Sequence, residues 1–154
     1  HKNHINKFNA LYENVELLDI RDVEPAEYLQ FLDDYVKSEH KKATIAKEEN
    51  VKAKEVLSDL EAYGVVGYVL KVDGKIVGLE VGEILGDYYS HIEKADKTYN
   101  GVYSKLVQLV SQDLQEKVKY MNREEDLNEP GLRRSKRGYK PIGYIEKNQV
   151  KILD

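Results

Sequence analysis

The stretch VVGYVLKVDGKIVGLEVGEILGDYYSHIEKA (residues 65–95) carries the clearest secondary-structure signals of this 154-residue chain. Two runs rich in valine, isoleucine and leucine lie on either side of Asp73-Gly74. An Asp-Gly pair between such runs is a strong hairpin signal, because both turn positions favour a positive φ. Gly86-Asp87 marks a second turn before residues 87–95. The stretch therefore predicts a three-stranded antiparallel meander.

Residue patterns outside the meander complete the prediction of an α/β (α+β) fold. One expected helix has Pro25 in its first turn, a second spans 45–63, and a third begins near Asn100 or Gly101. A short basic helix or turn is expected at 129–138. Expected strands span 15–20, 117–122 and, as one or two strands, 141–153. The order β-α-α-β-β-β-α-β-α-β(β) predicts a mixed sheet with helices on both faces. This order is similar to that of the GNAT acyltransferases, a likeness of fold alone.

Composition narrows the class of protein. With 41% hydrophobic and 34% charged residues, the chain is typical of globular proteins. No apolar run approaches the roughly 20 residues of a membrane-spanning helix. The absence of cysteine excludes disulfides, thiolate metal sites and a cysteine nucleophile, and it suits a reducing compartment, so we expect a cytoplasmic protein. The histidines show no spacing typical of a metal site, and no metal is expected.

The segment YMNREEDLNEPGLRRSKRGYKP (120–141) carries the most specific motif. It resembles the signature of the phosphatidylglycerol lysyltransferase C-terminal domain-like family, roughly Y-x-N-R-E-x-D-L-G-x-x-G-L-R-x-x-K-x-x-Y-x-P. HIEKAD (91–96), the hairpin at 69–83 and KNHINKF (2–8) are similar to other parts of this family. Asn128 departs from the family by standing where glycine is preferred, and Gly138 by standing where serine is common.

The resemblance implies a GNAT-like domain over residues 15–154 and a tandem arrangement of two such halves. Residues 1–14 would then connect this half to a missing N-terminal half. Ile5, Phe8, Leu11 and Tyr12 have helical spacing, so this segment could form an amphipathic helix on either half. A domain whose partner half is missing should also self-associate, because large apolar patches are rare on monomers.

The resemblance further implies transfer of an aminoacyl group from aminoacyl-tRNA to a hydroxyl, as in lipid-modifying relatives. Strand ends would bring four carboxylates together as candidate catalytic or ammonium-binding groups: Glu93, Asp96, Glu124 and Asp126. The family motif adds candidate substrate-binding residues, namely Asn122, Arg123, Arg133, Lys136 and Tyr139. The alternative is that these acids pair with the basic residues to hold the loop. The whole domain could equally be a non-catalytic binding module.

The helix start at residues 97–103 is the expected place for a cofactor phosphate. Enzymes with this fold that use coenzyme A place a glycine-rich loop there, whose backbone N–H groups bind pyrophosphate. Here Gly101 is the one candidate cofactor-binding residue, and Asn100 and Val102 bring side chains where glycine is wanted. We therefore expect no coenzyme A binding. The alternative is an ordinary helix entry capped by Thr98 or Asn100.

Two further features are open to different readings. Residues 133–140 (RRSKRGYK) could meet tRNA phosphates or anionic lipid headgroups, although charge runs more often form a solvated face. The net charge of −4 gives no general attraction to nucleic acid. His91 is the histidine nearest the proposed site, where it could act as a base or could simply face solvent.

Overall fold

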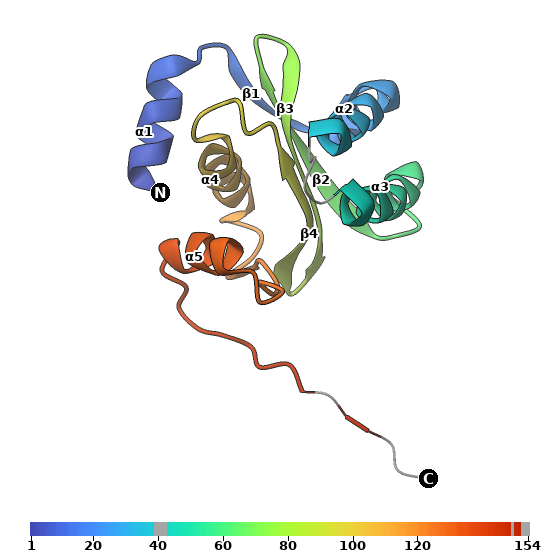
Figure 1. Ribbon diagram of the computed structural model, residues 1–154, viewed down its shortest axis with the longest axis vertical. Coiled ribbons are helices and arrows are strands. Elements are labelled where there is room, and N and C mark those ends of the chain that lie inside the picture. The colour runs from blue at the N-terminus through green and yellow to red at the C-terminus, as the bar shows by residue number, and fades with distance from the viewer. Residues whose placement is uncertain (39–42, 149, 152–154) are drawn as a thin grey trace. The chain divides into compact units, whose positions relative to one another are not determined.

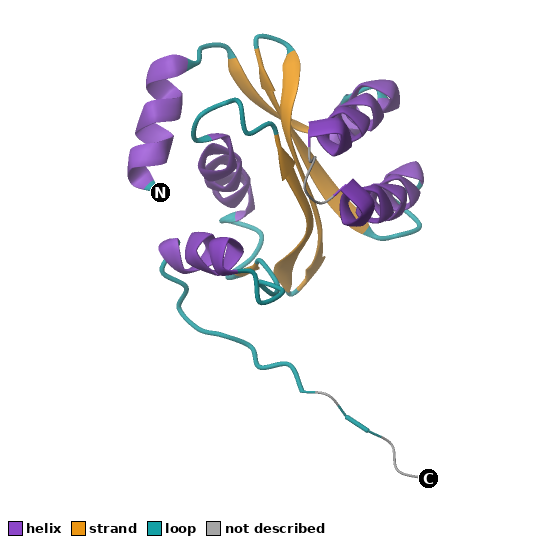
Figure 2. Cartoon of the chain, viewed as in Figure 1, coloured by secondary structure: helices purple, strands orange, loops and turns teal. Residues whose placement is uncertain are grey.

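A five-stranded sheet runs through the N-terminal part of the chain (Figures 1 and 2). The computed structural model describes residues 1–38, 43–148 and 150–151. The strands lie in the order β1 (Val15–Asp19), β2 (Val65–Val72), β3 (Lys75–Leu85), β4 (Asp87–Ala95) and β5 (Met121–Asn122). Neighbours are antiparallel from β1 to β4, whereas β4 and β5 are parallel. The mixed sheet that the sequence predicted is confirmed.

The meander forms where the turn residues predicted it. Asp73 and Gly74 have φ angles of 49° and 77°, and Gly86 has a φ of 79°. A Cβ atom disfavours this left-handed region, which is why glycine stands at both turns. β2, β3 and β4 therefore pair as consecutive antiparallel neighbours.

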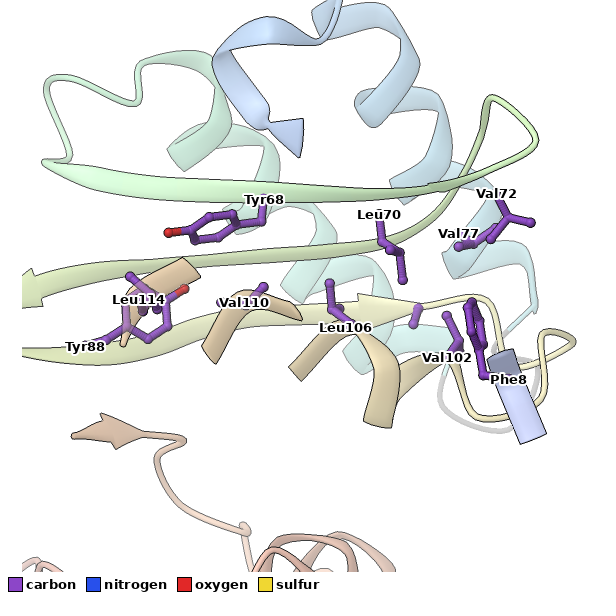
Figure 3. Packing of buried hydrophobic residues seen from close by; sticks show 11 residues of the cluster. Phe8, Tyr68, Leu70, Val72, Val77, Tyr88, Val102, Leu106, Val110 and Leu114 are labelled. Carbon is purple, nitrogen blue, oxygen red and sulfur yellow. The ribbon is translucent and has the colours of Figure 1, made fainter. Parts of the chain in front are cut away.

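Helices cover both faces of the sheet (Figure 1). α1 (Lys2–Leu11) and α4 (Val102–Leu114) lie on one face, and α2 (Pro25–Ser38) and α3 (Ala43–Ser58) lie on the other. A short 3-10 turn, Ile20–Asp22, precedes α2. Each face has its own apolar cluster. Figure 3 shows Tyr68 and Tyr88 from the sheet packed with side chains of α4, and Phe8 from α1 in the same cluster.

The N-terminal segment is helical, as its spacing predicted, and it docks on this half. Phe8 is fully buried, and the rings of Tyr12 and Tyr99 lie 5.0 Å apart between centroids. α1 therefore contributes to the core formed with α4. A connection from residues 1–14 to a preceding half stays a prediction.

Two predicted elements are shorter in the structure. α3 ends at Ser58, because Asp59 accepts from the Ala62 N–H and residues up to Gly64 form turns. The strand expected at 117–122 is reduced to β5. The N–H groups of Lys117 and Val118 donate instead to the carbonyl of Leu114, which closes the turn after α4.

The chain divides into two units, residues 1–124 and 125–154. The second unit contains α5 (Pro130–Gly138), where the sequence predicted a short basic helix or turn at 129–138. The strand predicted over 141–153 is wrong for residues 141–148 and 150–151; the rest of it lies outside the described residues. Its apolar side chains Ile142, Tyr144 and Ile145 are 84%, 74% and 75% exposed. The pattern is strand-like, but a strand also needs a neighbouring backbone, and none of the described residues provides one.

Candidate functional site

The candidate site lies where β4 and β5 stop pairing. The two strands share only the pairs Tyr88–Met121 and Tyr89–Asn122, after which β4 continues to Ala95. Arg123 follows β5 directly and donates from Nη2 to both carboxylate oxygens of Glu93, at 2.6 and 2.7 Å, and from Nε at 3.2 Å. These side chains are 15% and 17% exposed, respectively. A largely desolvated ion pair therefore joins the strands beyond their last backbone pair.

His91 precedes Glu93 by two residues in the sequence and lies at a bulge in β4. Val81 pairs with Ile92 and Gly82 pairs with Ser90, so His91 is the extra residue of β4. Its Nε2 lies 3.0 Å from Glu83 Oε1, and its Nδ1 lies 2.8 Å from Glu124 Oε1. Imidazole donates from both nitrogens only when it is protonated. The arrangement is fully hydrogen-bonded either with an imidazolium or with one protonated carboxyl group.

The predicted catalytic acids of the first unit have different surroundings. Glu93 pairs with Arg123, and Glu124 contacts His91. Asp96 instead accepts from the N–H of Thr98 at 3.0 Å and from its hydroxyl at 2.7 Å, which closes the turn before α4. Asn122, predicted to bind substrate, accepts from the Glu124 N–H at 2.8 Å and so fixes the turn after β5.

The remaining predicted residues form contacts within the second unit. Arg133 donates to Asp126 and Asn128, at 3.0 Å from its Nη2 to each residue. The hydrogen bond from Arg133 holds the pKa of the Asp126 carboxyl at about 2. Lys136 donates to the carbonyl of Glu125 at 2.6 Å, and Tyr139 is the C-cap of α5. The motif residues thus fold this segment locally, while a direct role in binding substrate stays a prediction.

The helix start at Gly101 is covered by α1. Gly101 has a φ of 86°, and a Cβ atom there would lie 2.3 Å from the carbonyl oxygen of His4. The N–H of Asn100 donates to the Tyr12 hydroxyl at 3.0 Å, and His1 Nδ1 lies 2.8 Å from Ser104 Oγ. The backbone of α1 therefore lies against the helix start that was the expected position of a cofactor phosphate. The sequence suggested crowding by Asn100 and Val102; it did not predict this contact.

Sequence reasoning missed a buried acid next to Glu93. Glu80 on β3 is 0% exposed and pairs in register with Glu93. Its Oε1 accepts from the Tyr88 hydroxyl at 3.2 Å. Burial, and then the charge of Glu93, raise the pKa of Glu80 to about 8. The sequence signal that could have revealed the burial of Glu80 was a glutamate inside the apolar run VGLEV. This run lies at the centre of a strand that pairs on both sides.

Among the described residues, a surface pocket, metal ligands and membrane-spanning helices were the other features that could indicate a function. A surface pocket of about 250 Å³ lies over β1 and β2, but His91, Glu93 and Arg123 do not line it. Its charged residues pair locally, as in the 2.7 Å contact between Lys117 and Asp113. Within residues 1–38, 43–148 and 150–151, no group of histidine and acidic residues could hold a metal ion. None of the described helices is long and apolar enough to cross a membrane.

Residues 1–147 match the family described as "Phosphatidylglycerol lysyltransferase, C-terminal". The chain belongs to this family. No curated protein matches the chain. A solved structure of a conserved protein of unknown function from Bacteroides thetaiotaomicron is 30% identical, with a TM-score of 0.76, over 92% of this chain and 49% of that chain. This member of the family therefore spans about half the length of the Bacteroides protein.

More distant structures show the fold. A possible acetyltransferase from Clostridium difficile is 11% identical, with a TM-score of 0.65, over 92% of this chain and 100% of that chain. An aminoglycoside acetyltransferase from an uncultured soil metagenomic sample is 15% identical, with a TM-score of 0.62, over 91% of this chain and 95% of that chain. The family member described here has the GNAT acyltransferase fold that the order of elements predicted.

Proposed function

We propose that this chain is an acyltransferase domain that moves an aminoacyl group from aminoacyl-tRNA to a hydroxyl or amine acceptor. The observation that carries the proposal is the Glu93–Arg123 pair at the divergence of β4 and β5. His91, on the same strand as Glu93, lies between the carboxylates of Glu83 on β3 and Glu124 after β5. Membership of the lysyltransferase family supports an aminoacyl donor over a simple acyl donor. A tRNA-linked donor would place the reaction in the cytoplasm.

In the proposed chemistry an acceptor oxygen or nitrogen attacks the ester carbonyl of the donor. The bond between that carbonyl carbon and the tRNA ribose oxygen breaks, and the ribose oxygen leaves as a hydroxyl that takes up one proton. A general base must take the acceptor's proton: Glu124, whose Oε1 lies 2.8 Å from His91 Nδ1, can accept it as a carboxylate, and His91 can accept it in its neutral form. Glu93 carries the negative charge that an aminoacyl ammonium group requires, while Arg123 keeps that carboxylate fixed. The rest of the rate enhancement would come from positioning of donor and acceptor. No metal is needed for these steps.

We propose that coenzyme A is not the donor. A pyrophosphate at a helix start needs free backbone N–H groups and open space. In this chain the His4 carbonyl stands against Gly101, and the Asn100 N–H already donates to Tyr12. A carbonyl oxygen would also repel a phosphate oxygen, because both carry partial or full negative charge.

The basic helix α5 supports a nucleic-acid partner. Arg134 and Arg137 are exposed on α5, whereas Arg133 and Lys136 are held by contacts within their unit. Exposed arginines bind phosphates through charge and paired N–H donors. We propose that they meet the tRNA of the donor. Binding to anionic lipid vesicles in place of tRNA would contradict this assignment.

A partner half of similar fold is also proposed, because the chain spans about half of the Bacteroides protein. The exposed apolar residues of 142–150 are candidates for the surface that such a half covers. Without it, we propose self-association of the chain, which sedimentation measures. A strictly monomeric chain at high concentration would contradict this part of the proposal.

The alternative is a non-catalytic binding module. One observation favours it: Glu93, Glu124 and Asp126 all contact basic side chains of the chain itself. Such pairs also occur where acids only stabilise a loop. The two functions separate in a transfer assay with labelled aminoacyl-tRNA, since a module would bind the donor without moving its aminoacyl group.

A further inference from the structure

A buried carboxyl group, that of Glu80, lies beside the Glu93–Arg123 pair, and no ion pair joins it to a cation in the part of the chain that the structure describes. Glu80 is fully buried in β3, and Arg123 donates from Nε and Nη2 to Glu93. Glu80 Oε2 has no hydrogen-bond partner among the described residues. An ionised carboxylate in such a place costs several kcal/mol unless a cation compensates it. Two carboxyl groups thus share one guanidinium.

The groups around Glu80 come from every neighbouring element. Tyr68 of β2 and Glu93 of β4 are its partners in register, and the Tyr88 hydroxyl donates to it. From α4 comes Tyr103, whose pKa is raised mainly by burial and, to a smaller degree, by the charge of Glu93. Burial is the largest cause of the raised pKa of Glu80, and the charge of Glu93 is the second; Ser90, Arg123 and Tyr88 oppose them. With Glu80 protonated, Glu80, Glu93 and Arg123 together carry no net charge.

We infer that Glu80 is the proton-releasing group of this site. Glu80 stays protonated beside the Glu93–Arg123 pair while no ligand is bound, and it ionises when an ammonium group binds at Glu93. The inference rests on the proposed function, since an aminoacyl donor carries such a group. A cation at Glu93 offsets the charge that disfavours ionisation of Glu80 and attracts the new carboxylate directly. The proton passes to the solvent. Glu80 is thus a positioning residue, which sets the charge of the site and touches no reacting atom.

The same arrangement defines the class of ligand. An acyl group without an amine gains nothing from a second carboxylate, because such a group brings no positive charge to compensate the negative charge of ionised Glu80. An ammonium group gains two carboxylates in a largely water-free place, where charge interactions are strong. The site is therefore selective for amine-bearing acyl groups such as lysyl over neutral ones such as acetyl.

Calorimetry at pH 7 in phosphate and in imidazole buffer measures the proton release. The probe is Nα-acetyl-L-lysinamide, whose side-chain ammonium stays charged at this pH. The neutral control is Nα,Nε-diacetyl-L-lysinamide. We expect the charged probe to bind with release of about one proton per site, and the neutral one not to bind. Glu80→Gln should bind the charged probe with almost no proton release. Glu16→Gln, at an exposed strand position, should behave as the wild type.

A second readout needs no variant. The infrared band of a protonated carboxyl group should disappear when the charged probe is added to the wild-type chain. Binding without proton release, or with the band retained, overturns the role of Glu80 and leaves the amine site intact. No binding of the charged probe overturns the inference together with the ammonium selectivity. Transfer activity of the same preparation then shows separately whether the proposed function survives.

Discussion

Arg123 donates to both carboxylate oxygens of Glu93, at 2.6 and 2.7 Å, across the point where β4 and β5 stop pairing. The pair replaces backbone hydrogen bonds that the parted strands can no longer make. It also leaves a charged group at the divergence of two parallel strands, where ligands of α/β proteins commonly bind. Its contributions to stability and to function can be measured separately.

Breaking this pair from one side should be costly. Glu93→Gln removes the carboxylate that accepts the hydrogen bonds of the largely buried Arg123 guanidinium, and Arg123→Gln removes the cation that pairs with Glu93 next to Glu80. Each change should lower the free energy of unfolding by on the order of 3 kcal/mol, measured by urea denaturation. The double variant should lose clearly less than the sum of the two, because no charge is then left alone. Additive losses would show that the two side chains do not interact in solution.

The stability of the chain should depend on pH through Glu80. Its pKa is about 8 in the folded chain, against about 4.3 for an ordinary glutamate. Below pH 4 the Glu80 carboxyl is protonated in both the folded and the unfolded chain, so the stability that depends on protonated Glu80 is then fully present. Between pH 4.3 and 8 only the folded state keeps the proton, so stability is lost as the pH rises. Relative to the wild type, Glu80→Gln should therefore gain on the order of 3 kcal/mol between pH 5 and pH 8.

Chemical denaturation of the two proteins at pH 5, 6, 7 and 8 makes this comparison. Groups that titrate in both proteins cancel in the difference. A difference that does not change with pH would mean that Glu80 is ionised in the folded chain throughout this range.

The contact of α1 with the start of α4 can be tested at two glycines with the same backbone conformation. Gly101 and Gly86 have φ angles of 86° and 79°, but only at Gly101 would a Cβ meet another group, the His4 carbonyl at 2.3 Å. Gly86→Ala should cost roughly 1–2 kcal/mol of unfolding free energy for its left-handed backbone alone. Gly101→Ala should cost clearly more, because α1 must also shift. Equal losses would indicate that α1 does not lie against Gly101 in solution.

Coenzyme A should not bind the chain. The reason is the backbone of α1 at the start of α4, which stands where phosphate oxygens would need to approach. Calorimetry with acetyl-coenzyme A should give no binding, and the melting temperature should not rise with the cofactor. A micromolar dissociation constant would contradict the proposal and would point to an acetyl donor.

Much of the fold could be predicted from local sequence, whereas the site depends on tertiary structure. Asp73-Gly74 fixed the hairpin, because a turn type acts within a few residues. The bulge at His91 could not be predicted in this way, since it follows from the pairing of β4 with β3. For Glu80 the apolar residues around it were a local signal of burial, but its position opposite Glu93 depends on the same pairing. The strand expected over 141–153 was wrong for residues 141–148 and 150–151, because alternation in sequence does not supply a partner strand. The sequence placed Glu93 late in one strand and Glu124 after the next, and it offered pairing of the acids with basic residues as an alternative to catalysis. Which partner each acid takes, Arg123 for Glu93 and His91 for Glu124, depends on the tertiary structure.

The most direct test is a transfer assay with lysyl-tRNA carrying radiolabelled lysine, with phosphatidylglycerol vesicles or a soluble amine as acceptor. The wild-type chain should move the label from tRNA to an acceptor. Loss of a general base reduces rates by about 100-fold or more, so His91→Gln combined with Glu124→Gln should be almost inactive, while Glu16→Gln keeps the wild-type rate. Thermal unfolding of each variant shows that it remains folded. Label that stays on the tRNA with every acceptor, or an unchanged rate in the double variant, would contradict an aminoacyl-transfer site at the divergence of β4 and β5.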